Sequence, residues 1–357
     1  MKIGIVTYHR SHNYGALLQA IALRKTMADS GNEVYFIDYW PDYHIKMYST
    51  FRLSYLRRKK GIQKKIDYIL SYNHRKRRHD NFMKFISEYI QPFTAQKEEQ
   101  FDLVIYGSDQ IWRKQVSTGL YDPIYFGAKE ICSKYKASYA ASMGTIVNDK
   151  KDKAYLKHLI SNLDNISVRE EDLKVFIEEL GFLKVRVDLD PTLLLPKEKW
   201  EGLLHIDNNS NKEYLLFYDL LPDSFNQCEV IRFAESLNLE IRTIYGYARK
   251  KEDTYNISNA NPRDFVSLIS GAKFIITSSY HGLVFSIIFH KQFFASFSSN
   301  EGRAKSLLKT LNIDDRLIAP MAKFPRSYNE IDYTSVNNLL DITRFDSLSY
   351  LKSITKS

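Results

Sequence analysis

Cysteine is scarce in this 357-residue chain, and its two cysteines, Cys132 and Cys228, lie far apart. They match neither the spacing of a zinc site nor a disulfide framework, which is typical of a protein from a reducing compartment. The chain also lacks a run of about 18 apolar residues, so we expect no membrane-spanning helix. The apolar stretch at residues 3–6 is too short for a signal peptide, and cytoplasmic residence is therefore the expectation.

Motifs of several large enzyme classes are absent as well. The sequence has no Walker phosphate loop and no Gly-x-Ser-x-Gly elbow, and Asn13-Tyr14-Gly15 has too few glycines for a dinucleotide fingerprint. Hydrophobic residues make up 44% and charged residues 26% of the chain, close to the averages of globular proteins. This composition excludes a disordered chain, and the length suggests two domains.

Positive charge is concentrated in one stretch of the chain. The formal net charge is +9, whereas residues 46–79 alone hold twelve Lys or Arg and one acid, Asp67, which amounts to +11. Subtracting +11 from +9 leaves −2 for the rest, unlike the broad basic face of a nucleic-acid-binding protein, and no nucleic-acid partner is expected. Two interpretations of residues 46–79 stay open: a solvated face of basic helices, or peripheral contact with an anionic membrane.

Short apolar segments alternate with helical patterns along most of the chain. Residues 2–7 and 33–38 predict two strands, and a helix between them is marked by apolar residues at 17, 18, 21, 22 and 23. Such strand–helix–strand units form parallel sheets. Further strands are expected at residues 102–106, 136–140, 165–168, 185–189, 214–218, 240–244, 273–277 and 292–296. The chain therefore predicts an α/β protein with two open parallel-sheet domains, whose ligands bind at the carboxyl ends of the strands.

A polar segment at residues 205–211 divides the two series of strands and is interpreted as a linker. The expected domains are residues 1–204, with a basic helical insert at about 44–92, and residues 212–334. Apolar residues at 62, 66, 69 and 70 mark one helix of the insert, and those at 82, 85, 86 and 89 mark another. Residues 335–357 predict a C-terminal helix that packs back on the N-terminal domain.

The first candidate for catalysis is His281, which stands between an apolar strand and the apolar helix that starts near Leu283. Helix amide groups point at bound anions at such a turn, and Gly282 permits a close approach of the backbone. A histidine exchanges protons near neutral pH. The alternative is a helix-capping serine with an incidental histidine. The place of the segment at the carboxyl edge of the sheet favours function.

Arg169, Asp109 and Arg303 are further candidates, each with a structural alternative. The guanidinium of Arg169 directly follows a strand and suits a carboxylate or phosphate, or else it pairs with Glu170 or Asp172. Asp109 either accepts hydrogen bonds from sugar hydroxyls or caps the next helix. Arg303 either contacts an anion or is a solvated residue at the start of a helix.

Together these segments resemble the polysaccharide pyruvyl transferase family. The matching segments keep the family order and reach from the first strand to about residue 310; they are Thr7 with Asn13–Gln19, Gly107–Trp112, Tyr139–Gly144, Ile166–Glu170, Asp190–Leu194 and Ser278–Gly282. The resemblance implies two Rossmann-like domains facing across a cleft, similar to the GT-B type. It also implies transfer of pyruvate from phosphoenolpyruvate to a sugar of a bacterial capsular or exopolysaccharide, or of its lipid-linked precursor, with formation of a cyclic ketal.

The resemblance also implies the roles of residues. His281 and Arg169 correspond to the catalytic and donor-holding residues, whereas Ser279 stands where a second Arg is often found, and Arg303 and the insert are candidates for the missing charge. The expected donor side comprises Arg169, Ser278, Ser279, Tyr280, His281, Gly282 and Arg303. The expected acceptor side comprises Asn13, Tyr14, Gly15, Gly107, Ser108, Asp109, Ser142 and Gly144. No metal and no cofactor besides the donor phosphoenolpyruvate are expected.

Two other functions stay open at this point. One is a GT-B-type glycosyltransferase that uses a nucleotide-sugar donor on the same two-domain plan, which the serine at position 279 favours. The other is a non-catalytic protein that binds anionic glycans or nucleic acid, supported by the basic insert alone.

Overall fold

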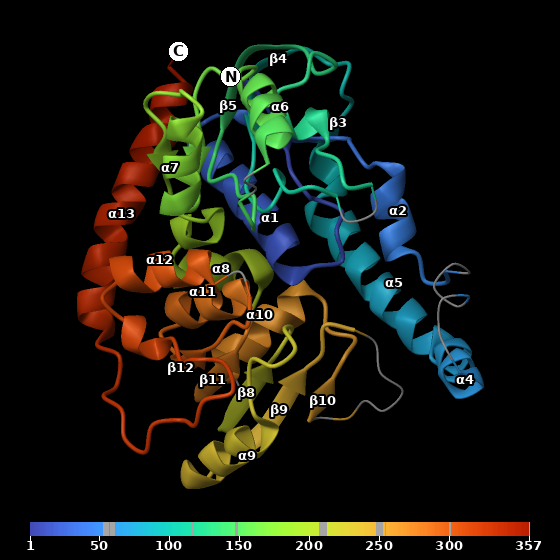
Figure 1. Cartoon of the computed structure of the whole chain (residues 1–357), viewed down its shortest axis with the longest axis vertical. Coiled ribbons are helices and arrows are strands. Elements are labelled where there is room, and N and C mark those ends of the chain that lie inside the picture. The colour runs from blue at the N-terminus through green and yellow to red at the C-terminus, as the bar shows by residue number, and fades with distance from the viewer. Residues whose placement is uncertain are drawn as a thin grey trace.

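The computed structural model describes residues 1–52, 57, 61–115, 118–146, 149–206, 213–247, 253, 255–299 and 301–356. Figure 1 shows one sheet in the half drawn in blue and green and a second in the half drawn in yellow and orange. Residues 207–211 of the predicted linker lie outside the described part. The predicted α/β fold with two Rossmann-like domains is confirmed, because both sheets are parallel and doubly wound.

The first sheet has five parallel strands in the order β3-β2-β1-β4-β5. These strands are β1 (Lys2–Val6), β2 (Glu33–Ile37), β3 (Thr94–Ala95), β4 (Phe101–Tyr106) and β5 (Ser133–Ser138). Beyond β5, single parallel bridges Ala137↔Asn165 and Ala141↔Val168 add the short pair β6 (Ser167–Val168) and β7 (Arg186–Val187). The strand order reverses between β1 and β4, and a ligand crevice is expected at the carboxyl ends of these two strands.

Four helices and three 3₁₀ turns accompany the first sheet: α1 (Tyr14–Asp29), α6 (Lys150–Ile160), α7 (Glu171–Glu179), α8 (Lys197–Leu204), η1 (Gln91–Phe93), η2 (Pro123–Phe126) and η3 (Pro191–Leu194). Helix α1 begins where the side chain of Asn13 accepts a hydrogen bond from the backbone N–H of Ala16. It is buried on nearly every side because it also contacts η3 and, in the second half, helix α10 (Pro262–Gly271). Helix α1 thus lies where the two halves meet.

The basic insert forms α2 (Asp42–Tyr48), α4 (Ile62–Leu70) and α5 (Tyr72–Tyr89), with residues 53–56 and 58–60 outside the described part. Figure 1 shows α4 at the edge of the molecule, and α5 begins next to α4 and runs past α10 to the first sheet. Helix α5 buries Phe82, Phe85 and Ile86, as the spacing predicts. It also contacts the second half, because Arg78 donates hydrogen bonds to the carbonyls of Ser258 (2.7 Å) and Tyr245 (3.4 Å). Part of the basic charge therefore joins the two halves.

The second sheet repeats the plan in the order β10-β9-β8-β11-β12, with all strands parallel. Its elements are β8 (Tyr214–Tyr218), α9 (Gln227–Ser236), β9 (Glu240–Ile244), β10 (Asn256–Ile257), α10 (Pro262–Gly271), β11 (Phe274–Thr277), α11 (Tyr280–Ile288), β12 (Gln292–Ala295), α12 (Gly302–Thr310) and η4 (Asp314–Arg316). Here the order reverses between β8 and β11. The segment that holds His281 directly follows β11, so this histidine lies at the crevice of the second sheet.

The last helix, α13 (Tyr333–Ile354), leaves the second half and contacts the first one. The hydroxyl of Tyr350 donates to the carbonyl of Ser138 at the end of β5 (2.9 Å), and Ser347 accepts from the backbone of Leu189 (3.0 Å). One hydrophobic cluster includes buried residues of both sheets and of α13. The two halves therefore share a core. In the described part, no helix is long and apolar enough to cross a bilayer.

Several predictions of local structure differ from the structure in length or position. The strands expected at 165–168 and 185–189 shrink to the two-residue β6 and β7, and the strand expected at 136–140 is shifted to Ser133–Ser138. The two-residue edge strands β3 and β10 were not predicted. No helix follows Asp109, so this residue is not a helix cap.

Candidate active site

The turn between β11 and α11 is built by short hydrogen bonds. Ser279 caps α11 by accepting from the backbone N–H of Gly282 (3.2 Å), and Thr277 accepts from the N–H of Ser279 (3.0 Å). A Cβ at Gly282 would lie 2.5 Å from the Thr277 hydroxyl, so only glycine fits. The capping serine that the sequence left as an alternative is present, and it places His281 in the first turn of the helix.

A cavity of about 210 Å³ lies between the two halves at this turn. Polar and aromatic side chains both contribute to its wall, which comprises Asn13, Tyr14, Gly15, Asp109, Gln110, Tyr218, Leu220, Leu221, Phe265, Ser278, Ser279, Tyr280, His281, Phe297, Ser299 and Arg303. The carboxyl ends of β8 and β11 meet the N-terminus of α1 here. The cavity therefore lies at the switch points that the two topologies indicate.

Behind His281 lies a buried ion pair. Nη1 of Arg169 is 3.0 Å from Oδ2 of Asp190, and their side chains are 2% and 0% exposed. Nε2 of His281 is 3.4 Å from the same carboxylate oxygen. Burial alone would raise the pKa of Asp190, but the charge of Arg169 and the contact with His281 hold it well below its usual range. One carboxylate oxygen of Asp190 therefore faces both the guanidinium of Arg169 and the imidazole ring of His281.

His281 also contacts the opposite half of the protein through Gly15. A Cβ built on Gly15 would lie less than 2.5 Å from Nδ1, Cγ and Cε1 of His281. No side chain fits between α1 and this ring, so glycine is required for the close approach rather than for its backbone conformation. The position of the imidazole is therefore fixed by Asp190 on one side and by the start of α1 on the other.

A second acid–base pair lies on the other side of Tyr280. Nε of Arg303 is 3.7 Å from Oε1 of Glu170, and that oxygen accepts from the Ser142 hydroxyl at 2.5 Å. Burial raises the pKa of Glu170, although Arg303 and Arg169 counteract the rise. The guanidinium carbons of Arg169 and Arg303 lie 5.4 and 4.9 Å from the centre of the Tyr280 ring. Two cations thus flank one aromatic residue of the cavity wall.

The N-terminal wall is held by hydrogen bonds inside the first half. Gln19 donates to the Thr7 hydroxyl (2.9 Å) and accepts from the backbone N–H of Ser108 (3.1 Å). The Ser108 hydroxyl donates to the carbonyl of Ala140 (2.7 Å) and accepts from Arg169. This network fixes the backbone next to Asp109, whose φ is +75°. Asp109 tolerates this left-handed conformation better than most residues do, and it lines the cavity.

A smaller cavity of about 120 Å³ adjoins the first one. Asn13, Asp109 and Gln110 line both cavities, so the two spaces meet at these residues. Helix α2 of the insert contributes His44, Met47 and Tyr48 to the wall of the smaller cavity, and Arg113 adds a positive charge. The insert therefore borders the candidate site.

The structure separates the predicted site residues into two groups. Nine of them line the cavity between the halves: Asn13, Tyr14, Gly15, Asp109, Ser278, Ser279, Tyr280, His281 and Arg303. The other six are not part of the wall of either cavity: Gly107, Ser108, Ser142, Gly144, Arg169 and Gly282.

The structural alternative for Arg169, a salt bridge to an acid, is present, although the partner is Asp190 rather than Glu170 or Asp172. The structural alternative for Arg303 was wrong. Arg303 is not a solvated residue, because its side chain is only 14% exposed. Asp190 received no role from the sequence, although an acid directly after a predicted strand and before Pro191 was a usable signal.

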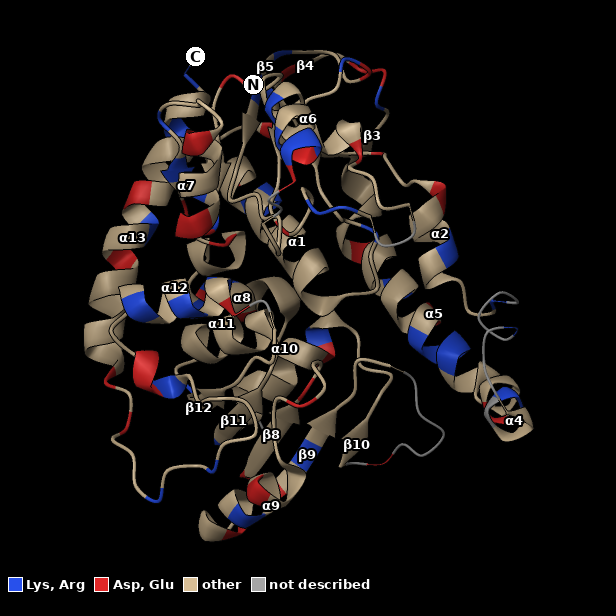
Figure 2. Cartoon of the chain, in the orientation of Figure 1, with Lys and Arg blue, Asp and Glu red and all other residues tan. Residues whose placement is uncertain are grey.

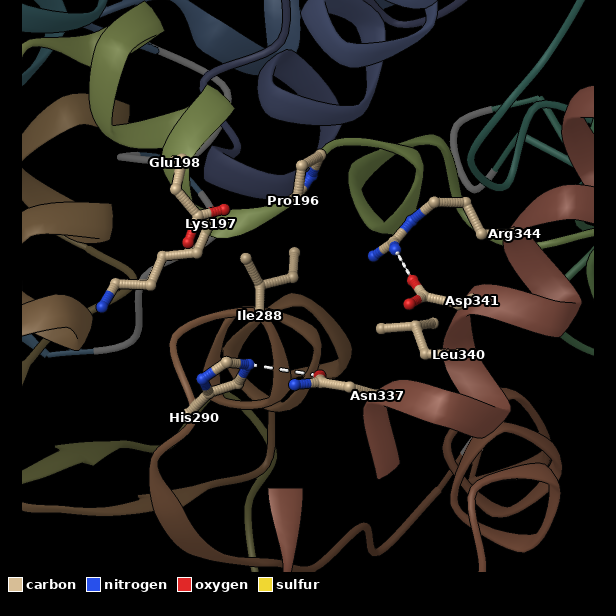
Figure 3. Close-up of a pocket in the computed structure, with 9 residues that line it drawn as sticks. All are labelled: Pro196, Lys197, Glu198, Ile288, His290, Asn337, Leu340, Asp341 and Arg344. Atoms are coloured by element: carbon tan, nitrogen blue, oxygen red, sulfur yellow. Dashed lines mark hydrogen bonds and ion pairs between the residues drawn. The ribbon is translucent and has the colours of Figure 1, made fainter. Parts of the chain in front are cut away.

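A further cavity of about 190 Å³ lies between α8, the C-terminal end of α11 and α13 (Figure 3). Its polar side chains already have partners, since His290 contacts Asn337 at 3.2 Å and Arg344 pairs with Asp341. It lies at the end of α11 opposite His281. The cavity at the strand ends is therefore the better candidate for the active site. The described residues contain no group of three or more His, Cys, Asp or Glu that could hold a metal ion.

Residues 13–300 match the profile of the polysaccharide pyruvyl transferase family, which covers most of the chain and every residue of the cavity wall except Arg303. The chain belongs to this family. Its members are transferases, so the protein is an enzyme of that class. No curated protein matches the sequence.

Solved structures with a similar course of the chain are distant in sequence. UDP-GlcNAc 2-epimerase from Neisseria meningitidis bound to UDP-GlcNAc is 12% identical, with 100% of both chains covered and a TM-score of 0.42. A putative UDP-N-acetylglucosamine 2-epimerase from Listeria monocytogenes is 8% identical, with 97% of this chain and 90% of that chain covered and a TM-score of 0.49. The E. coli heptosyltransferase WaaC with ADP is 11% identical, with 96% of this chain and 100% of that chain covered and a TM-score of 0.42. At these scores the similarities carry no argument about substrate or reaction.

Proposed function

We propose that this member of the pyruvyl transferase family transfers pyruvate from phosphoenolpyruvate to a sugar and forms a cyclic ketal. The sugar belongs to a cell-surface polysaccharide or to its lipid-linked precursor. The observation that carries the proposal is the convergence of Arg303, His281 and the N-terminus of α11 on one cavity between the halves. A cation, a proton donor and free helix amides are the groups that a phosphorylated carboxylic acid requires.

The donor side is the half of the cavity formed by the second sheet. Arg303 is the cation of the cavity wall, and its guanidinium suits a carboxylate or a phosphate. The start of α11 adds the backbone N–H groups of Tyr280 and His281, which have no partner inside the helix. We assign Arg169 a positioning role, because its guanidinium is buried against Asp190 and Ser108.

His281 is proposed to move the protons of the reaction. It donates a proton to the methylene carbon of phosphoenolpyruvate, which creates an oxocarbenium-like centre at the carbon that bears the phosphate. A sugar hydroxyl attacks this carbon and returns a proton to His281. The bond between this carbon and the phosphate oxygen then breaks, and a second hydroxyl attacks the same carbon and closes the ketal. The proton of the second hydroxyl leaves with the phosphate. Asp190, held ionised by Arg169, stabilises the protonated form of His281 between these steps.

The acceptor side is proposed to be the wall formed by the first sheet. Asn13 and Asp109 stand where the two cavities meet, and both carry oxygens that accept hydrogen bonds from sugar hydroxyls. The smaller cavity next to α2 then holds the rest of the acceptor. We place the reaction in the cytoplasm, because Cys132 and Cys228 are both free thiols and exposed.

Donor binding is the direct test of this proposal. We expect phosphoenolpyruvate to raise the melting temperature, whereas UDP-sugars and GDP-sugars leave it unchanged. The variant Arg303→Gln removes the cation of the donor side and is expected to abolish the shift. Its control, Arg326→Gln, removes an exposed arginine remote from the site and keeps the shift. Stabilisation by a nucleotide sugar but not by phosphoenolpyruvate would instead assign the protein to the glycosyltransferases.

A further inference from the structure

Helix α4 presents an apolar stripe to solvent. Ile62, Ile66, Ile69 and Leu70 share one face at helical spacing, and they are 74%, 41%, 52% and 62% exposed. Side chains of this size usually lie in a core, and four of them together on one exposed face indicate a contact surface. This stripe is called the α4 face below.

The orientation of α4 is fixed by contacts on its opposite side. Tyr68 is only 7% exposed, and its hydroxyl accepts from the backbone N–H of Arg52 (2.8 Å). The guanidinium of Arg75 lies 3.8 Å from the centre of the Tyr68 ring and donates to the Tyr68 and Thr50 carbonyls (2.7 and 2.9 Å). Because Tyr68 is turned toward the rest of the insert, the α4 face is turned away from it.

Basic residues lie on α4 and on the part of α5 next to it, and Figure 2 shows them as blue segments. Lys76 and Arg77 at the start of α5 are exposed, and Lys65 is half-buried on α4 itself. Asp67 is the one acid among residues 46–79, which hold twelve Lys or Arg.

We propose that the α4 face docks on an anionic lipid bilayer. The isoleucines and Leu70 enter the boundary between headgroups and acyl chains, and the surrounding Lys and Arg contact lipid phosphates. Charge decides between this occupant and a second copy of the chain, because two inserts of +11 repel each other, whereas an anionic surface attracts them. Figure 1 places α4 at the edge of the molecule, where a flat surface reaches it.

The place of the insert agrees with this docking. Its helix α2 lines the smaller cavity of the site, while its helix α4 carries the exposed face. One insert therefore connects the acceptor side of the proposed reaction with the bilayer where a lipid-linked sugar would be found. Vesicle binding itself needs no turnover, so it can succeed or fail independently of the proposed function.

Co-sedimentation with vesicles tests the proposal. We expect the protein to bind phosphatidylcholine vesicles that contain about one third phosphatidylglycerol and to ignore pure phosphatidylcholine. The triple variant Ile62→Ser, Ile66→Ser, Ile69→Ser is expected to lose this binding. The triple variant Lys65→Gln, Lys76→Gln, Arg77→Gln is expected to weaken it about fivefold per removed charge. All six positions lie at the surface or half-buried in the insert, and circular dichroism verifies that the variants fold.

Leu183→Ser is the matched control, because Leu183 is 86% exposed on the first half, away from the insert. This variant is expected to bind like the wild type. Equal binding to both kinds of vesicle, or wild-type binding by the isoleucine variant, would overturn the proposal. A different outcome would assign the α4 face to a second copy of the chain. In that case light scattering detects a dimer of the wild type, the isoleucine variant is a monomer, and neither binds vesicles.

Discussion

Replacing Gly15 by alanine tests whether the two halves jointly position His281, the proposed catalytic residue. Gly15 lies in the first turn of α1, where alanine is the better helix former by about 1 kcal/mol. Helix propensity alone therefore predicts a more stable protein. The added Cβ, however, would lie less than 2.5 Å from three ring atoms of His281, whereas ordinary contacts begin at 3.4 Å. Either the ring or the two halves must move by roughly 1 Å.

A displacement of this size near the reacting centre lowers turnover by about 100-fold. The assay is phosphate release from phosphoenolpyruvate with the acceptor glycan, together with urea unfolding. We expect Gly15→Ala to lose activity and to gain no stability. The control is Gly202→Ala in α8, because a Cβ there meets nothing within 4 Å. It should keep full activity and gain about 0.5–1 kcal/mol. Full activity with raised stability in Gly15→Ala would refute the reasoning.

Three further predictions concern ionisable side chains that are buried or partly buried. Asp190→Asn leaves Arg169 buried without a counter-charge and should lower the free energy of unfolding by about 3–5 kcal/mol. The double variant Asp190→Asn, Arg169→Met should recover stability in urea unfolding, but it should not recover turnover. Burial lowers the pKa of His9 from 6.5 to about 4, so the unfolded chain takes up a proton first as pH falls, and stability decreases between pH 6.5 and 4. His9 contributes about 2 kcal/mol to the loss of stability from pH 7 to 5, and the loss measured by urea unfolding of His9→Gln should be smaller by this amount. Arg78→Met removes the hydrogen bonds between α5 and the second half, and it should lower the free energy of unfolding by about 1.5–3 kcal/mol. Amide hydrogen exchange at this contact should become faster. Unchanged exchange at Ser258 would contradict this role.

The sequence predicted the fold class because both sheets are made of short buried strands separated by helices. Strands such as β8 and β11 are apolar at nearly every position, which is typical of a parallel sheet covered on both faces. The two-residue strands β3 and β10 could not be predicted in this way. They are defined by pairing with a neighbour rather than by their own side chains.

The sequence indicated some residues of the candidate site but not the contacts between them. The strand ends indicated His281, Asp109 and Arg303, because position along a parallel sheet determines which residues meet at its edge. The sequence could not show that Arg169 is buried against Asp190, since this pair joins segments brought together only by the folded sheet. It also could not show that Gly15 contacts His281, which depends on how the two halves pack.

The first half of this protein is completed only when helix α13 has been synthesised. Tyr350 donates a hydrogen bond to Ser138, which lies 212 residues earlier in the chain. At about 5–20 residues per second, the ribosome needs roughly 10–40 s to make the segment between them. During that interval the second sheet is synthesised, and the end of β5 in the first sheet is not yet covered by α13. The nascent chain is therefore most open to chaperones and proteases at the edge of the half that is translated first.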